Sequence, residues 1–248
     1  MAKSELNLEQ WEQFVSSRRT TRDFLPTQVP QNIIDAILTD AMTAPSWSNT
    51  RPYLVGVAQG EIRDRISASF LARWEKAAEA IAGGFWGKAK LLITRFGLPK
   101  SDYKVNRKYP EDLKPRSAKV GADLYGLLGI ERDDHESRRA QWAKNYEFFG
   151  APVSFFIFTH SGLGEYSVSD AGLFMQNLML SAHARGLGTC AQGASALWAD
   201  PVKAEFNVPK DYKLLCGIAL GYPSDHKVNN FQAERLPISE IVVKPVND

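Results

Sequence analysis

The spacing of hydrophobic residues along this chain changes between a helical and a strand-like pattern. Over 7–15, 30–44 and 61–82, apolar residues recur every three or four positions, which predicts three helices. Asn7 is expected to cap the first helix, and Pro30 is expected to open the second, where its missing N–H costs nothing. The first third of the chain is therefore predicted to be mainly helical.

Continuous apolar runs predict the strands. The runs at 153–159 and 214–221 are typical of buried strands, and shorter runs at 54–58 and 241–243 predict two more. Because these few strands are separated by long helical segments, the pattern predicts an α/β (α+β) fold with helices around a central sheet.

A long helix is predicted over 169–185. Its surface is apolar nearly all round, which indicates a central, buried helix, and Gly186 and Gly188 can terminate it. Residues 96–148 are predicted to form a variable excursion or lid, irregular up to 117 and helical from 123 to 149. Since no repeat or linker divides the chain, residues 1–248 are expected to form a single domain.

Composition and charge narrow the possible functions. Hydrophobic residues make up 44% of the 248 residues and charged residues 23%, as in ordinary globular proteins. The formal net charge is +2, so no global field favours nucleic acid or an anionic membrane. No apolar run approaches the roughly 20 residues of a membrane span. The first residues lack the apolar core of a signal peptide, so we expect a cytoplasmic location.

Metal and thiol chemistry are not expected. The four histidines show no metal-ligand spacing with cysteines or carboxylates. Cys190 and Cys216 lie in apolar surroundings, which favours two buried thiols over a disulfide or a reactive group.

Candidate chemistry begins at 17–24, where the sequence is Ser-Arg-Arg-Thr-Thr-Arg-Asp-Phe. Three guanidinium groups and two threonine hydroxyls lie within a few residues. Guanidinium pairs with phosphate bidentately and hydroxyls add short donors, so this segment is suited to gripping a phosphate monoester. The alternative for an arginine pair is a solvated surface with carboxylate partners.

A second polar segment follows at 44–53, Ala-Pro-Ser-Trp-Ser-Asn-Thr-Arg-Pro-Tyr. It is suited to presenting hydrogen-bonding groups to the edge of a planar ligand, and the alternative is a plain turn before a strand. Together, 17–24 and 44–53 resemble the two N-terminal signatures of the nitroreductase family of FMN-dependent oxidoreductases. Segments 186–193 and 217–223 resemble the later family segments in the right order.

The resemblance implies a nitroreductase-like fold, with a mixed central sheet and the long helix at a homodimer interface. FMN would be bound at that interface by both chains, with N- and C-terminal arginines meeting at its phosphate and the backbone near 186–193 passing the flavin ring. Small residues there permit close approach of the main chain. The cofactor residues implied are Arg18, Arg19, Thr20, Arg22, Ser46, Asn49, Ala191, Gln192, Gly193 and Arg235.

Two positions depart from the family pattern. Arg51 stands where Gln is usual, and Gln232 stands where a further Arg is common. Arg51 is therefore expected either to pair with the anionic edge of reduced flavin or to face a negatively charged substrate. A cation near the flavin edge would stabilise reduced flavin, a role that Arg19 or Arg22 is also placed to fill.

The implied reaction passes a hydride from NADPH or NADH to FMN and then to a nitroaromatic compound or quinone, in ping-pong order at one site. No catalytic side chain is assigned. Part of the middle resembles the branch that reduces nitrobenzoates. Reductive dehalogenation, flavin breakdown and flavin binding without turnover are the alternatives. Besides Arg51, the substrate candidates are Trp47, Tyr125, Phe148 and Phe149, for each of which core packing is the alternative.

Overall fold

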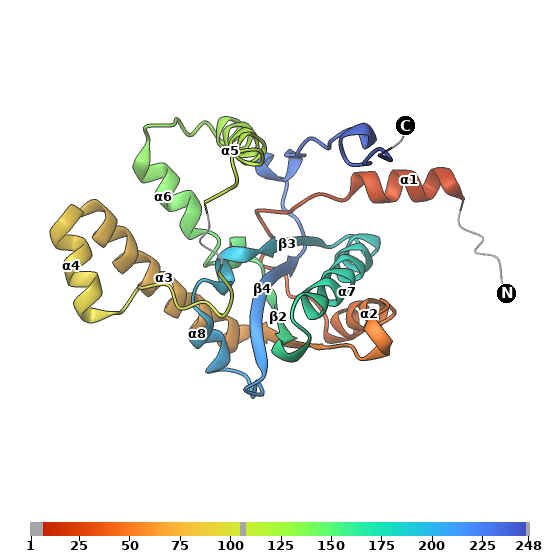
Figure 1. The fold of residues 1–248 in the computed structure, drawn as a ribbon, viewed down its shortest axis with the longest axis horizontal. Helices are drawn as coiled ribbons and strands as arrows, with labels where there is room; N and C mark the ends of the chain where they lie inside the picture. The colour runs from red at the N-terminus through yellow and green to blue at the C-terminus, as the bar shows by residue number, and fades with distance from the viewer. Residues whose placement is uncertain (1–6, 105–107, 247–248) are drawn as a thin grey trace.

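The computed structural model describes residues 7–104 and 108–246 (Figure 1). The prediction about a signal peptide rests on residues 1–5, which lie outside the described ones. Within these ranges, no helix is long and apolar enough to cross a membrane.

A four-stranded sheet lies at the centre of the molecule (Figure 1). All three strand pairs are antiparallel, and parallel pairing among the described residues is limited to two isolated bridges, Thr20 with Thr189 and Lys100 with Trp198. The predicted α/β class is confirmed, as are the strands predicted at 54–58, 153–159 and 214–221. In spatial order the strands are β1 (Tyr53–Gln59), β2 (Val153–His160), β4 (Tyr212–Gly221) and β3 (Gly188–Gln192).

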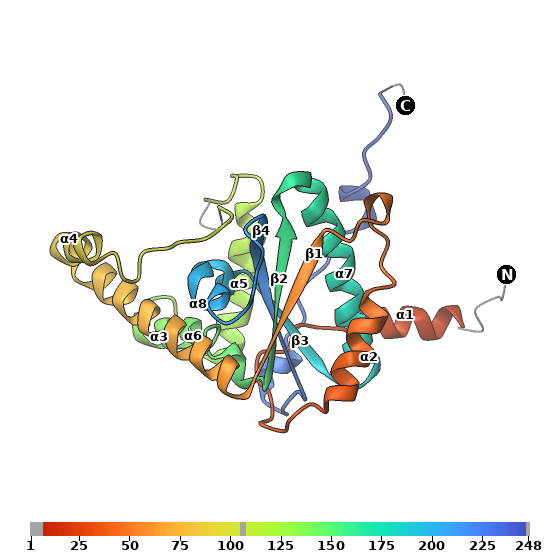
Figure 2. The ribbon, with the colours of Figure 1, turned by 90° about the horizontal axis from the view of Figure 1, so that it is seen from below.

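Helices cover both faces of the sheet (Figures 1 and 2). The longer ones are α1 (Leu8–Ser17), α2 (Gln31–Ala41), α3 (Gly60–Ala82), α4 (Gly84–Thr94), α5 (Lys114–Leu128), α6 (His135–Ala143) and α7 (Glu165–Ala184), and α8 (Ala199–Lys203) is short.

Strand β2 is apolar at successive positions instead of alternating between apolar and polar residues, because it is buried on both faces. Phe155 and Ile157 pack into the core shared with α2 and α7, whereas Phe156 and Phe158 pack into the core shared with α3 and α8. Successive side chains of a strand point to opposite faces, so a strand buried on both faces needs apolar residues at every position. All four side chains are at most 1% exposed.

Four predictions about elements were wrong or incomplete. The apolar run 241–243 forms no strand: Val242 and Val243 are 62% and 88% exposed and lie in a bend and an extended tail, because no neighbouring strand of the described chain pairs with them. The helical stretch 123–149 is broken, since Gly129 adopts φ 74° and ends α5 before α6 begins. Helix α4 and strand β3 were not predicted.

The long helix α7 is not buried all round. It packs against α2 and the sheet through residues such as Phe174 and Leu178, which are 1% and 0% exposed. On another face, Leu173 is 45% exposed. An apolar helix with one uncovered face is expected where a further surface packs on it.

Candidate functional site

The segment that follows α1 is extended and lies beside β3. Thr20 forms the parallel bridge with Thr189, and the Thr21 N–H donates to the Thr189 carbonyl at 2.9 Å. Arg18, which ends α1, already has extended φ and ψ of −63° and 126°. The arginine-rich segment therefore forms a short backbone connection with the edge strand of the sheet.

Asn229 clamps this segment from the C-terminal part of the chain. Its Oδ1 accepts from the Arg22 N–H at 2.8 Å, and its Nδ2 donates to the Asp23 carbonyl at 2.8 Å. Ser224 Oγ donates to Asp23 Oδ1 at 2.5 Å. The sequence carries no signal that links Asn229 to a segment more than 200 positions earlier, so its role was not predicted.

Because Gly188 has no side chain, the arginine-rich segment after α1 can lie close to β3. A Cβ at this position would overlap Thr21 Oγ1 and stand 2.8 Å from Thr21 Cβ. The sequence predicted that small residues here admit a ligand to the backbone. At Gly188, the group admitted is instead the Thr21 side chain, which is buried.

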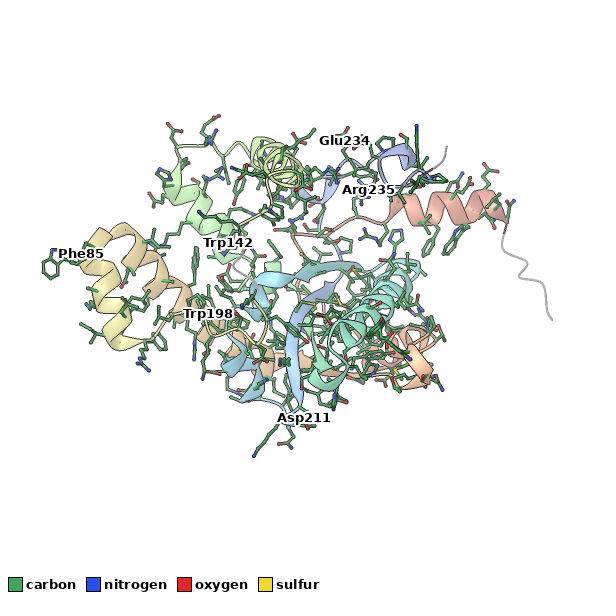
Figure 3. All side chains as sticks on the ribbon, in the orientation of Figure 1. Phe85, Trp142, Trp198, Asp211, Glu234 and Arg235 are labelled. Atoms are coloured by element: carbon green, nitrogen blue, oxygen red, sulfur yellow. The ribbon has the colours of Figure 1, made fainter. Side chains whose placement is uncertain are left out.

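Four arginines gather at this place. Thr20, Arg22 and Arg235 line a small cavity together with Val120 of α5, Arg18 lines a second cavity, and Arg19 borders both. Figure 3 shows Arg235 on the C-terminal segment. Burial, and then the positive charge of Arg235, hold the pKa of Arg18 below its usual value. The positive charges are thus close enough to destabilise one another.

No carboxylate compensates these charges in the part of the chain that the structure describes. Its ion pairs include none of Arg18, Arg19, Arg22 and Arg235. Arg235 donates instead to the Ala233 carbonyl at 2.7 Å. The solvated-surface alternative required carboxylate partners, so the geometry favours an anion site.

Gln232, the departure from the family pattern, lines the same small cavity but carries no charge. Its Nε2 donates to the Ser16 carbonyl at 3.0 Å, near the C-terminal end of α1. It thereby ties the C-terminal segment to the helix that precedes the arginines. Arg22 lies over the Phe231 ring at 5.8 Å, which fixes the same two segments together.

The second cavity, of about 370 Å³, adds His183, a residue that the sequence did not single out. Its Nε2 lies 2.8 Å from Ser17 Oγ, and its ring packs against Phe14. Burial, and then the charges of Arg18 and Arg19, lower the pKa of His183. The histidine is therefore neutral at neutral pH and adds no further positive charge.

The end of β3 carries Ala191, Gln192 and Gly193, the residues predicted to lie against the flavin ring. Ala191 and Gly193 are exposed, and a Cβ on Gly193 would meet nothing within 4 Å. Gln192 is 2% exposed, and its Nε2 donates to the Asn145 carbonyl at 2.7 Å. Its Oε1 is buried without a partner among the described residues. The exposed backbone at the end of β3 therefore lies near Arg22, because the charge of Arg22 acts on Cys190, the residue before Ala191.

Both thiols are buried and unpaired, as predicted. Burial raises the pKa of Cys190 and of Cys216 to about 12, so both stay protonated. Over residues 7–104 and 108–246, no group of three His, Cys, Asp or Glu side chains is arranged to hold a metal ion.

The loop with Ser46 and Asn49 is strained and well anchored. Ser46 Oγ accepts from the Arg51 N–H at 2.9 Å, and the Trp47 N–H donates to Asp170 Oδ2 at 3.1 Å. Ser48, Asn49 and Arg51 have φ of 48°, 57° and 46°. Such left-handed conformations cost about 1–3 kcal/mol each in non-glycine residues and cluster at functional sites.

Within one chain this loop does not meet the arginine cluster. It is anchored at Asp170 near the N-terminal end of α7, whereas Ser17 contacts His183 near the C-terminal end. Thirteen residues of helix span about 20 Å at 1.5 Å per residue. Figure 2 shows the loop after α2 at one end of α7 and the end of α1 toward the other. The two predicted halves of the cofactor site are therefore separated.

The candidate substrate residues are also dispersed. Phe148 and Phe149 are 0% and 7% exposed and belong to the core around α3, which favours core packing, the alternative given for them, over contact with a substrate. Tyr125 is half-buried on α5, with the Arg138 guanidinium 4.1 Å from its ring centre. Trp47, which is 51% exposed, and Arg51 belong to one loop.

Fold and site together define a class of protein. An α/β domain with an arginine cluster that forms no ion pair among the described residues, beside an exposed strand end, is suited to bind a phosphate-bearing ligand.

Comparison with known proteins narrows this class. The family model "Nitroreductase family" matches residues 15–222. A 4-nitrobenzoate reductase from Pseudomonas putida is 35% identical over 217 residues, covering 87% of this chain and 86% of that protein. Nitroreductase NfnB from Mycolicibacterium smegmatis is 32% identical over 230 residues, covering 92% and 90%.

A solved nitroreductase structure is also similar to this chain. The FMN-dependent nitroreductase NfnB from Mycobacterium smegmatis, in complex with NADPH, superposes with a TM-score of 0.81 at 30% identity, covering 96% of this chain and 100% of that one. The chain belongs to the nitroreductase family. Membership confirms the predicted resemblance and the predicted class of enzyme, an oxidoreductase.

Proposed function

We propose that this protein is an FMN-dependent oxidoreductase that uses NADPH to reduce nitroaromatic compounds. Its relatives are named for nitro reduction, and the NfnB structure from Mycobacterium smegmatis is described as FMN-dependent and NADPH-bound. The observation on this chain that carries the proposal is the cluster of Arg18, Arg19, Arg22 and Arg235 without an anionic partner among the described residues.

These residues fit FMN. Arg18, Thr20 and Arg235 would hold its phosphate, because a dianion removes the repulsion that lowers the pKa of Arg18. Arg22 places a positive charge beside β3, where the backbone of Ala191 and Gly193 is open. When bound, FMN supplies hydride acceptance and donation, and the protein supplies orientation and charge. No side chain of the chain is needed as a general acid.

We infer that the working protein is a homodimer in which each site uses both chains. Ser46 and Asn49 lie about 20 Å along α7 from the arginine cluster, too far to contact the same small ligand from one chain. A second copy would supply the missing half. Several uncovered apolar surfaces support this, namely Leu8 and Trp11 on α1, Leu173 on α7 and Val242 and Val243 in the tail, which are 69%, 42%, 45%, 62% and 88% exposed.

The proposal is tested by following the flavin spectrum of the purified protein under anaerobic conditions. We expect NADPH to bleach the absorption of bound flavin, and a nitroaromatic added afterwards to restore it. NADH and a quinone are run in parallel to rank donors and acceptors. If the protein binds FMN but NADPH and NADH leave the spectrum unchanged, the chain is a flavin-binding protein without this activity. If it binds no FMN, the proposal fails entirely.

A further inference from the structure

The strongest feature left unexplained is the environment of Arg51. Its Nη1 lies 3.4 Å from the carbonyl of Asn49, a long contact within its own loop. The ion pairs of the described residues do not include Arg51. A half-buried guanidinium without a carboxylate has unused capacity for two parallel hydrogen bonds to an anion.

The backbone holds this guanidinium in place. The Arg51 N–H donates to Ser46 Oγ at 2.9 Å, and the Arg51 carbonyl accepts from the Tyr53 N–H at 2.8 Å. Arg51 itself has φ 46°, a conformation that a non-glycine residue keeps only where its surroundings enforce it. The side chain therefore starts from a fixed point, which suits recognition of a ligand group at a defined place.

The carboxylate that anchors this loop is already engaged. Asp170 is 5% exposed, and its Oδ2 accepts from the Trp47 N–H at 3.1 Å. Arg51 and Asp170 act from two sides on the buried hydroxyl of Tyr53: burial raises the pKa of Tyr53, the charge of Arg51 lowers it and that of Asp170 raises it. Arg51 is thus near Asp170 but forms no ion pair with it.

Two exposed aromatic rings stand beside the loop. Trp47 is 51% exposed and Tyr166, at the start of α7, is 55% exposed, and their rings meet edge to face. Half-exposed aromatic rings at a loop that also carries an arginine suit a flat ring with an anionic substituent.

Resting on the proposed function and deepening it, we propose that Arg51 selects aromatic substrates that carry a carboxylate on the ring. The guanidinium binds the carboxylate while Trp47 and Tyr166 contact the ring. Arg51 is a specificity-determining residue that touches the substrate away from the reacting nitro group.

The test compares two substrates that differ only in charge, 4-nitrobenzoate and its methyl ester. In Arg51→Gln we expect the ratio of their kcat/KM values to shift toward the ester by about 10- to 100-fold, through loss of a charge-assisted pair. Arg51→Lys keeps the charge without the planar fork and should shift the ratio less. The matched control is Arg95→Gln, because Arg95 is also an arginine with positive φ, 55°, but ends α4 in another part of the molecule. It should leave the ratio unchanged.

A binding measurement separates this inference from the proposed function. Benzoate, which is not reduced, is titrated into the FMN-loaded protein by calorimetry, and its affinity should fall in Arg51→Gln by a similar factor while FMN affinity stays within a few-fold. If wild type reduces no nitro compound yet binds benzoate through Arg51, the proposed function fails and this inference stands. Equal substrate ratios in wild type and Arg51→Gln overturn the inference. A loss of FMN with no change in ratio also overturns it and assigns Arg51 to the cofactor.

Discussion

At the scale of single residues, the site is defined by charges that the protein brings together without neutralising them. Arg18 and Arg235 come from opposite ends of the sequence, and burial, followed by the positive charge of Arg235, lowers the pKa of Arg18. Holding like charges together costs free energy in the cofactor-free protein, and a phosphate dianion removes that cost. This arrangement predicts that phosphate recognition contributes strongly to cofactor affinity.

Replacing Arg18 or Arg235 by Ala should weaken FMN binding by about 1.5–3 kcal/mol, or about 10- to 150-fold, because each substitution removes a charge-assisted bond to phosphate. Fluorescence quenching gives the dissociation constant. Riboflavin, which lacks the phosphate, is the matched control ligand, and its affinity should change far less. Equal losses for FMN and riboflavin would show that these arginines act on the fold instead of the phosphate.

His183 predicts a pH dependence of the cofactor-free protein. Its pKa is lowered from the model-peptide value of 6.5 by burial and by Arg18 and Arg19, so the unfolded state binds the proton at higher pH than the folded state does. The free energy of unfolding should therefore fall as pH drops below about 6.5, until the folded pKa is passed. Denaturant unfolding between pH 7 and 5 measures this slope. It should flatten in His183→Gln, and an unchanged slope would contradict the account.

At the scale of elements, β3 and the segment after α1 form one unit whose spacing depends on Gly188. Gly188→Ala would force a methyl group into Thr21, so we expect a loss of about 1–3 kcal/mol in stability together with weaker FMN binding. Gly121→Ala on α5, where a Cβ meets nothing within 4 Å, should instead stabilise by about 0.5–1 kcal/mol. Combining Gly188→Ala with Thr21→Ala should recover part of the loss. Thermal unfolding of the four proteins checks this, and no loss in Gly188→Ala would refute the packing argument.

The sequence predicted those helices and strands whose structure depends mainly on their own residues. Val153–Thr159 is apolar throughout because it is buried on both faces, and Asn7 caps α1 by accepting from the Glu9 N–H as its position suggested. Strand β3 was missed because Thr189 is its only β-branched residue, and pairing with β4 creates the strand. The run 241–243 has β-branched bulk but no neighbouring strand in the described chain.

The sequence predicted which residues gather at the candidate site better than it predicted how they are arranged in space. Arg18, Thr20, Arg22 and Arg235 do come together, because the motif order reflects a shared fold. The contacts of Asn229 and His183 could not be predicted, since they join distant segments and neither residue has a distinctive local pattern. The single-domain organisation and the cytoplasmic location stay predictions.

At the scale of the whole molecule, α7 separates two half-sites that a second copy would join. The exposed Leu173 of α7 and the exposed apolar residues Leu8 and Trp11 of α1 agree with burial in a homodimer. Sedimentation equilibrium should therefore give about twice the chain mass of 27.6 kDa at micromolar concentration. A mass equal to that of one chain would contradict the shared site.

The most direct test of the shared site is complementation between two defective chains. One variant carries Arg18→Ala and Arg235→Ala, and the other carries Ser46→Ala and Asn49→Ala, so that each homodimer has both of its sites damaged. The two chains are co-expressed with different affinity tags, and the heterodimer is isolated over both columns and its FMN content measured. Our account predicts that the heterodimer retains one FMN, bound where the intact arginines of one chain meet the intact loop of the other. A heterodimer that retains no more FMN than either homodimer would contradict a site built from both chains.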